Sequence, residues 1–164
     1  MPSTVQLLTF LVDSDEYALD IMRVREIARP LPVRPIPGAP AGLVGVINLR
    51  HTEVIPIIDL RRRFELPPAA ELRNQRIIVC VVEARLIGLF VDEVVDVVNV
   101  ERRDIHSGSG IFRGKAAGLF AGVCHVRNRL LVLLNLKRLL SSEDRIAIDA
   151  VRQEIASARA GEES

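Results

Sequence analysis

Short apolar runs separated by turn-forming residues dominate the chain. Residues 5–12 form an extended run, and residues 17–21 alternate with period two after a polar cluster at residues 13–16. Alternation places every second side chain on one face of a strand, so these two runs predict a hairpin. The same pattern predicts further strands over residues 45–50, 54–60, 76–83, 86–91, 94–100, 119–126 and 130–134.

Prolines, glycines and one amphipathic stretch mark what lies outside the strands. The prolines between residues 30 and 40 fix φ and lack N–H groups, so they predict an extended loop, and Pro56 predicts an edge or a bulge in its strand. The run of Ser and Gly at residues 107–110 predicts a second loop. Near the C-terminus, Ser142 can cap a helix over residues 141–160. Its first turn carries Glu143 and Asp144, and its apolar stripe is Ile148, Val151 and Ile155.

The blocks of strands recur in the same order in the two halves of the chain. Residues 45–50 resemble residues 122–127, and residues 57–62 resemble residues 133–138, with one residue fewer between the blocks. Chance similarity is the alternative, because strand propensity alone enriches Val, Ile and Leu. A third matching block, residues 17–21 and 87–91, favours a repeat.

Two units of about five short strands suit small closed barrels, which leave no exposed sheet edges. We therefore predict a mainly β fold of two five-stranded barrels, like Src-homology-3 barrels, that share a core. The barrels would occupy about residues 5–64 and 76–140 of a domain spanning residues 1–140, with exchange of strands between them left open. The C-terminal helix would cover one seam.

Composition and charge narrow the classes of function. The chain is 49% hydrophobic and 26% charged, as in a globular protein, and its 22 Lys and Arg nearly balance its 21 Asp and Glu. Near neutrality and few aromatic residues disfavour nucleic acid, anionic membrane surfaces and base stacking. No signal segment is visible and no apolar run reaches the ~20 residues that span a bilayer. We therefore expect a cytoplasmic protein.

The sequence contains little that suggests catalysis, a cofactor or a metal site. Residues 110–116 depart from a phosphate-binding loop in glycine spacing and in lacking the final hydroxyl. His51, His106 and His125 are isolated, Cys80 and Cys124 fit buried apolar positions, and neither residue type shows metal-ligand spacing. Ser107, His51 and Asp59 could assemble in space, but no nucleophile motif supports them. The arginines at residues 61–63 fit a solvated turn better than an anion site.

Glu26 and Arg50 are each the charged member of an apolar strand segment, and Asp96 and Arg127 are their counterparts in the second half. Each pair could be a surface ion pair of little energetic consequence. The alternative is an exposed charged spot between apolar neighbours that a partner protein could recognise.

Four segments together resemble the CheW-like family of chemotaxis coupling proteins. They are VREI at residues 24–27, GVINLR at 45–50, VIPIIDL at 54–60 and IGLFVDEV at 87–94, and the resemblance covers about residues 5–140. It implies a non-enzymatic adaptor that couples chemoreceptors to a CheA-type histidine kinase. It also implies a free-standing protein that is monomeric in isolation, without a cofactor or direct membrane insertion.

The resemblance also indicates where partners bind. In that family the Glu of the first segment and the Arg of the second matter for coupling to receptor and kinase, which implies Glu26 and Arg50 here. The neighbouring candidates are Val24, Ile27, Val44, Val46 and Asn48. Since the first half keeps the family pattern more closely, we expect the main contact on the first barrel.

One departure affects that region. The family has glycine after the Arg, but this chain has His51. Glycine at such a turn commonly supplies φ > 0, which His adopts only at a cost, so the loop geometry and the preference for partners could both differ.

Two other functions remain as alternatives. One is a small-molecule-sensing or hydrolytic barrel that uses residues 107–118 as a lid, with His106 or Lys115 contacting the ligand. The other is a nucleic-acid-binding barrel, which the charge and the aromatic content disfavour.

Overall fold

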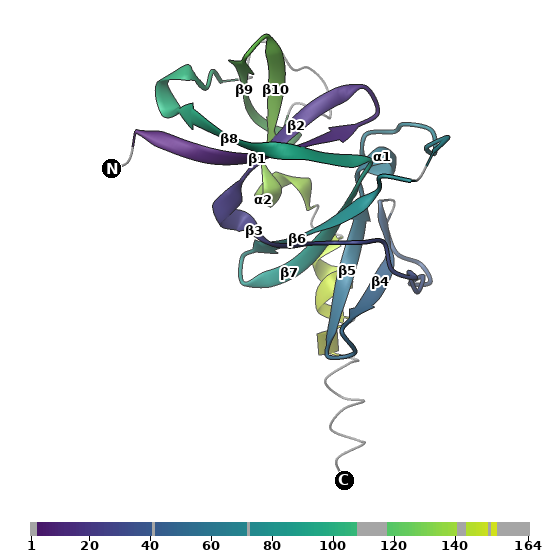
Figure 1. Cartoon of the computed structure of the whole chain (residues 1–164). Helices are drawn as coiled ribbons and strands as arrows, with labels where there is room; N and C mark the ends of the chain where they lie inside the picture. The colour runs from purple at the N-terminus through teal and green to yellow at the C-terminus, as the bar shows by residue number, and fades with distance from the viewer. Residues whose placement is uncertain are drawn as a thin grey trace.

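A computed structural model describes residues 3–40, 42–71, 73–107, 118–140, 144–150 and 152–153. Within them the chain forms two five-stranded sheets that curl into adjoining barrels (Figure 1). Sheet A has the order β8-β1-β2-β10-β9, and sheet B has the order β3-β6-β7-β5-β4. The strands of sheet A are β8 (Glu93–Glu101), β1 (Thr4–Val12), β2 (Asp15–Asp20), β10 (Arg129–Leu134) and β9 (Phe120–Val126). Those of sheet B are β3 (Val24–Ala28), β6 (Arg76–Val82), β7 (Arg85–Val91), β5 (Glu53–Asp59) and β4 (Leu43–Leu49).

Each sheet contains strands from both halves of the sequence. Sheet A joins the hairpin β1–β2 to β8, β9 and β10, whereas sheet B joins the hairpin β6–β7 to β3, β4 and β5. Corresponding strands occupy corresponding places, and each sheet has one parallel pair, β10 with β2 and β5 with β7. The sequence repeat is therefore a structural repeat with exchanged hairpins, and the two predicted segments do not coincide with the two sheets.

Short helical segments connect the strands. They are the 3-10 turns η1 (Ile21–Arg23) and η2 (Arg102–Asp104) and the one-turn helices α1 (Leu60–Arg63) and α2 (Leu136–Leu139). Residues 144–150 and 152–153 are helical, and Ile148 is buried, as the predicted C-terminal helix requires. The predicted cap Ser142, together with Glu143, Val151 and Ile155, lies outside the described residues.

The buried apolar residues form three clusters. One lies within sheet A around Leu7 and Leu131, and another lies within sheet B around Ile47 and Ile57. The third draws residues from both sheets, including Phe10 and Ile78. This third cluster is the shared core, so the predicted mainly β fold of two barrels on a common core is confirmed.

A glycine in each half lets a loop approach a strand closely. Arg34 in the proline-rich loop exchanges two backbone hydrogen bonds with Val46 of β4, and His106 exchanges two with Val123 of β9. A Cβ atom on the preceding glycine would lie 2.2 Å from the carbonyl oxygen of Arg34 at Gly45, and 2.6 Å from that of His106 at Gly122. The repeat thus extends to this local packing.

One local prediction about the prolines agrees with the structure, and another is partly wrong. The segment over residues 30–40 is non-regular apart from the bridge at Arg34, as its prolines predict. Strand β5, however, lies inside sheet B and not at its edge. Pro56 is accommodated for two reasons. The parallel ladder with β7 begins only at Ile57. On the other side, the partner of Pro56 on β4 is Val46, which directs its backbone N–H and C=O to Arg34.

Candidate functional site

Glu26 and Arg50 meet in one bidentate ion pair on the surface of sheet B. Glu26 lies on β3, and Arg50 lies in the turn that follows β4, so the pair joins the two edge strands of the sheet. Both guanidinium Nη atoms donate to the Glu26 carboxylate at 2.9 Å. The Arg50 side chain is 57% exposed and that of Glu26 is 26% exposed. Two residues that are distant in sequence therefore form a single accessible charged feature.

A second bidentate pair lies beside the first. Arg25 donates to both carboxylate oxygens of Glu53 at 2.6 and 2.8 Å, and Arg50 lies 3.9 Å from Glu53. Hydrogen bonding by Arg50 lowers the pKa of Glu26, and hydrogen bonding by Arg25 lowers the pKa of Glu53. Both carboxylates are thus charged at neutral pH, and the four residues form an alternating ionic ladder across the barrel seam.

The apolar candidates differ in how accessible they are. Ile27 is 44% exposed, whereas Val24 is half-buried and packs against the shared core. Val44 is also half-buried, against the core of sheet B. Val46 and the exposed Asn48 line a surface groove together with the proline-rich loop. Among these candidates, the side chains that a partner can reach most directly are therefore Ile27 and Asn48.

A second groove, of about 280 Å³, lies between the two sheets. Sheet A contributes Leu19 and Leu134, and sheet B contributes Val81 and Val82. Its rim carries charges of both signs, from Asp20, Arg23, Glu83 and Lys137. This groove has the mixed lining expected of a protein-binding cleft.

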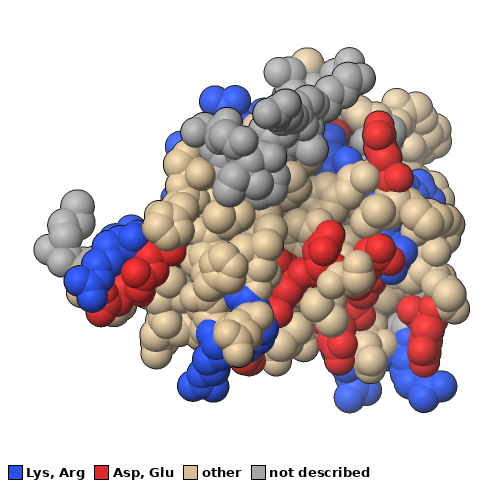
Figure 2. Space-filling view, turned by 90° about the horizontal axis from the view of Figure 1, so that it is seen from above, with Lys and Arg blue, Asp and Glu red and all other residues tan. Residues whose placement is uncertain are grey.

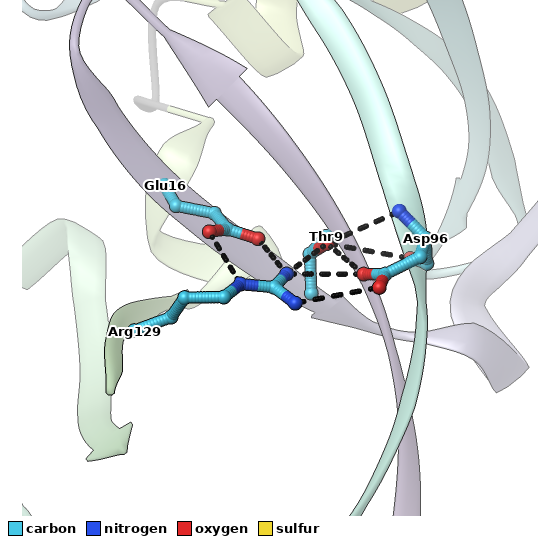
Figure 3. Close-up of polar contacts among 4 residues, drawn as sticks. All are labelled: Thr9, Glu16, Asp96 and Arg129. Atoms are coloured by element: carbon cyan, nitrogen blue, oxygen red, sulfur yellow. Dashed lines mark hydrogen bonds and ion pairs between the residues drawn. The ribbon is translucent and has the colours of Figure 1, made fainter. Parts of the chain in front are cut away.

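In sheet A the ion-pair partner of Asp96 is Arg129 and not the predicted counterpart Arg127, whose charge contributes less to lowering the pKa of Asp96. Arg129 donates to Asp96 at 3.1 Å and to the carboxylate of Glu16, and the hydroxyl of buried Thr9 donates to Asp96 at 2.8 Å (Figure 3). The hydrogen bonds from Arg129 and Thr9 lower the pKa of Asp96. The sequence comparison did not single out Arg129, whose counterpart in the first half is Glu53, a residue of opposite charge that pairs with Leu49 as Arg129 pairs with Val126.

The arginines at the end of β5 are not the solvated turn that the sequence predicted. Arg61 is 14% exposed and bonds Asp92 through Nε at 2.9 Å and Nη2 at 2.6 Å. Arg63 is 15% exposed and pairs with the buried Asp144. Only Arg62 of the three is well exposed, at 67%. The prediction failed because the pattern of the segment gave no sign of partners far away in the sequence.

The remaining candidates for chemistry are dispersed. His51 follows β4 of sheet B, whereas Ser107 follows the His106 bridge to β9 of sheet A. Asp59 accepts a hydrogen bond from the backbone N–H of Arg61 and so caps α1. In the described part of the chain, no group of three or more His, Cys, Asp or Glu could hold a metal ion. Cys80 and Cys124 are buried and free, as predicted. Residues 108–117 of the alternative ligand site, including Lys115, lie outside the described residues.

His51 keeps the backbone conformation that glycine would supply. Its φ is 60° and that of Arg50 is 52°, and the corresponding residues Arg127 and Asn128 have φ values of 50° and 65°. Both hairpins therefore turn with two consecutive left-handed residues, as in tight primed turns. The substitution leaves the turn itself in place and adds an imidazole next to Arg50.

Charge is distributed without a dominant sign. On the face seen from above, acidic and basic side chains lie beside one another among uncharged ones (Figure 2). No helix among the described residues is long and apolar enough to cross a membrane.

Comparison with known proteins identifies the family. The family model for the CheW-like domain matches residues 6–144. The chain belongs to the CheW-like family. It is 37% identical over 142 residues to a chemotaxis protein CheW of Rhizobium meliloti, covering 87% of this chain and 91% of that protein. It is 36% identical over 144 residues to a chemotaxis protein CheW of Treponema pallidum, covering 85% of this chain and 84% of that one.

A solved structure agrees with this assignment. The scaffolding protein CheW of Thermoanaerobacter tengcongensis superposes with a TM-score of 0.78 at 26% identity, over 88% of this chain and 96% of that one. The predicted resemblance to chemotaxis coupling proteins is thereby confirmed at the level of the family.

Proposed function

We propose that this CheW-like chain is a non-enzymatic cytoplasmic adaptor that couples chemoreceptors to a CheA-type histidine kinase. The observation that carries the proposal is the ion pair of Glu26 and Arg50. Two residues from separate family segments converge on one exposed spot of sheet B, with Ile27 and Asn48 nearby. A charged pair beside an exposed isoleucine and an exposed asparagine has the mixed composition of a specific protein contact.

The ionic ladder and the groove between the sheets would let one chain hold two partners at once. The ionic ladder lies at the seam of sheet B, whereas the groove of about 280 Å³ lies between the sheets. We propose that one partner binds at the ladder and the other in the groove between the sheets, with sheet A as a brace and secondary docking surface. Such an arrangement would place the kinase beside receptor tips at the inner face of the membrane.

Charge reversal tests the contact, provided that the ion pair itself is controlled for. Glu26→Arg and Arg50→Glu each break the pair and change the surface charge, whereas the double exchange restores the pair with its charges swapped, although it also places a carboxylate beside Glu53. If the pair contacts a partner, the double variant folds like the parent protein but is still defective in pull-down of kinase or receptor. A purely structural pair would regain both stability and binding in the double variant.

The neighbouring pair provides the matched control. Exchanging Arg25 and Glu53 swaps an equally well-formed pair on the same ladder. We expect this variant to retain more binding than the exchange at Glu26 and Arg50. Unchanged affinity of every folded Glu26 and Arg50 variant for both partners would remove these residues from the contact.

A further inference from the structure

The outer edge of β4 carries a groove that shares Asn48 with the surface proposed for coupling. Its volume is about 580 Å³, and its lining is largely apolar. One wall is the proline-rich loop from Pro32 to Pro37, and the other comprises Val46, Ile47, Asn48 and Val54. Arg34 is the one charged residue in this lining.

The backbone hydrogen bonds on this outer edge of β4 are only partly satisfied by the proline-rich loop. Arg34 and Val46 exchange hydrogen bonds of 2.8 and 2.9 Å, as in an antiparallel ladder. In such a ladder the next hydrogen-bonded residue along β4 is Asn48, and the loop residue opposite it is Pro32. Proline has no N–H, so the ladder cannot continue. The backbone N–H and C=O of Asn48 therefore face the groove, where an added strand could bond them.

The register of β4 with β5 supports the same orientation. Val46 lies opposite Pro56, and Asn48 lies opposite Val54. Pro56 cannot donate to Val46, so this pair is a non-hydrogen-bonded one, and positions two residues apart share that character. Neither Val46 nor Asn48 thus directs its backbone polar groups toward β5.

Charge indicates which kind of segment would bind. From Ile27 to Thr52 the sequence contains Arg29, Arg34 and Arg50 and no acidic residue. Arg50 is paired with Glu26, whereas the exposed Arg34 has no ion-pair partner among the described residues. An extended segment alternating acidic and β-branched side chains would place carboxylates on Arg34 and apolar groups on Val46 and Val54.

We propose that the outer edge of β4 accepts an extended acidic segment of a partner protein as an added strand, bonded to the backbone of Asn48 and to the guanidinium of Arg34. This site differs from the ionic ladder and from the groove between the sheets. It shares Val46 and Asn48 with the candidate partner surface, but its proposed bonds come from the backbone of Asn48 and the side chain of Arg34.

Peptide binding to the full chain tests the inference. The probe is a short fluorescein-labelled peptide of alternating valine and glutamate, followed by fluorescence polarisation. We expect saturable binding that Arg34→Glu weakens by about tenfold, as for loss of one charge-assisted hydrogen bond. A peptide of alternating valine and lysine should bind Arg34→Glu better than the parent chain. Arg29→Glu, an exposed arginine outside the groove lining, is the matched control and should have a smaller effect.

The backbone contribution is tested separately. N-methylation of alternate residues of the peptide removes its N–H donors on one edge, and methylation in one of the two registers should abolish binding. Hydrogen exchange should show protection of the Asn48 amide when the unmodified peptide is bound. Absence of saturable binding, equal binding by both methylated peptides and the parent peptide, or equal binding by Arg34→Glu and the parent chain would each overturn the proposal. None of these results would alter the pull-down outcome for kinase and receptor.

Discussion

Replacing Gly45 with alanine should be one of the most damaging single-methyl changes in the chain. The added Cβ would lie 2.2 Å from the carbonyl oxygen and 2.8 Å from the carbonyl carbon of Arg34, both backbone atoms. No rotamer change can relieve this overlap, so the loop must leave β4 and both hydrogen bonds between Arg34 and Val46 are lost. Gly45 also has a φ of 153°, which L residues rarely adopt.

These effects give the expected size of the loss. Two hydrogen bonds contribute about 1 kcal/mol each, and an unfavourable φ costs about 1–3 kcal/mol. We therefore expect Gly45→Ala to lower the free energy of unfolding by about 3–5 kcal/mol, or Tm by roughly 6–20 °C for a chain of this size. Urea denaturation measures the free energy, and hydrogen exchange should show faster exchange at the amides of Arg34 and Val46.

Gly122→Ala is the internal control for this reasoning. Its Cβ would lie 2.6 Å from the carbonyl oxygen of His106, but Gly122 is not among the residues with positive φ. It should therefore cost about 1–3 kcal/mol less than Gly45→Ala, by the amount of the φ strain. A loss below about 0.5 kcal/mol for Gly45→Ala, within the range of ordinary surface changes, would refute the argument.

Three further predictions concern single residues. Burial raises the pKa of Tyr17 to about 12, and since Tyr17 is the only tyrosine, phenolate absorbance of the native protein should stay low near pH 10, where an exposed tyrosine is half-ionised. Its contribution to stability is present below pH 10 and is lost as the pH rises toward 12, a loss that Tyr17→Phe should remove. Arg129→Gln should lower the free energy of unfolding, measured in urea, by about 1–2 kcal/mol. This is less than for a fully buried pair, because the Arg129 side chain is 30% exposed. The control Arg127→Gln, at an exposed residue, should change the free energy of unfolding little. Since the pKa of Asp96 is lowered in the folded state, the stability it provides is lost as pH falls below 3.8, and Arg129→Gln should flatten this acid dependence. His51→Gly should raise the free energy of unfolding by about 0.5–1 kcal/mol, because relief of the left-handed strain outweighs the greater unfolded entropy of glycine; an unchanged urea midpoint would contradict this.

The sequence was most informative where local pattern determines structure. Alternating apolar residues located nine of the ten described strands, and the tenth, β3, was expected only as the apolar strand segment that contains Glu26. The repeat of strand blocks gave the number of strands. Gly45 and Gly122 occupy equivalent places in this repeat, and each allows a loop to approach its strand closely. Exchange of the hairpins between the sheets could not be derived, since pairing β1 with β8 or with a nearer strand buries similar side chains.

The charged residues show where the sequence pattern does not predict the ion-pair partner. Glu26 and Arg50 could be paired from sequence because family resemblance and the repeat marked both. Neither the family resemblance nor the repeat singled out Arg129. Its contacts to Glu16 and Asp96 depend on β10 lying beside β2, a parallel pairing between the two ends of the chain. Sequence analysis therefore found the pair of Glu26 and Arg50 in sheet B, without Arg25 and Glu53, and assigned the wrong arginine in sheet A.

Exchange of the hairpins bears directly on how an adaptor could hold two partners at a fixed spacing. Asp92 lies where the chain passes from β7 of sheet B to β8 of sheet A, and it is 17% exposed. It accepts hydrogen bonds from Arg61 of α1 and from the backbone N–H of Asp13 in the β1–β2 turn. A hinge at this crossover would have to break a half-buried ion pair, a backbone bond and the shared core together, which is costly. A partner on the ladder of sheet B and another in the groove between the sheets would therefore be held by one rigid body, so their spacing would be set by the fold and not by a flexible linker.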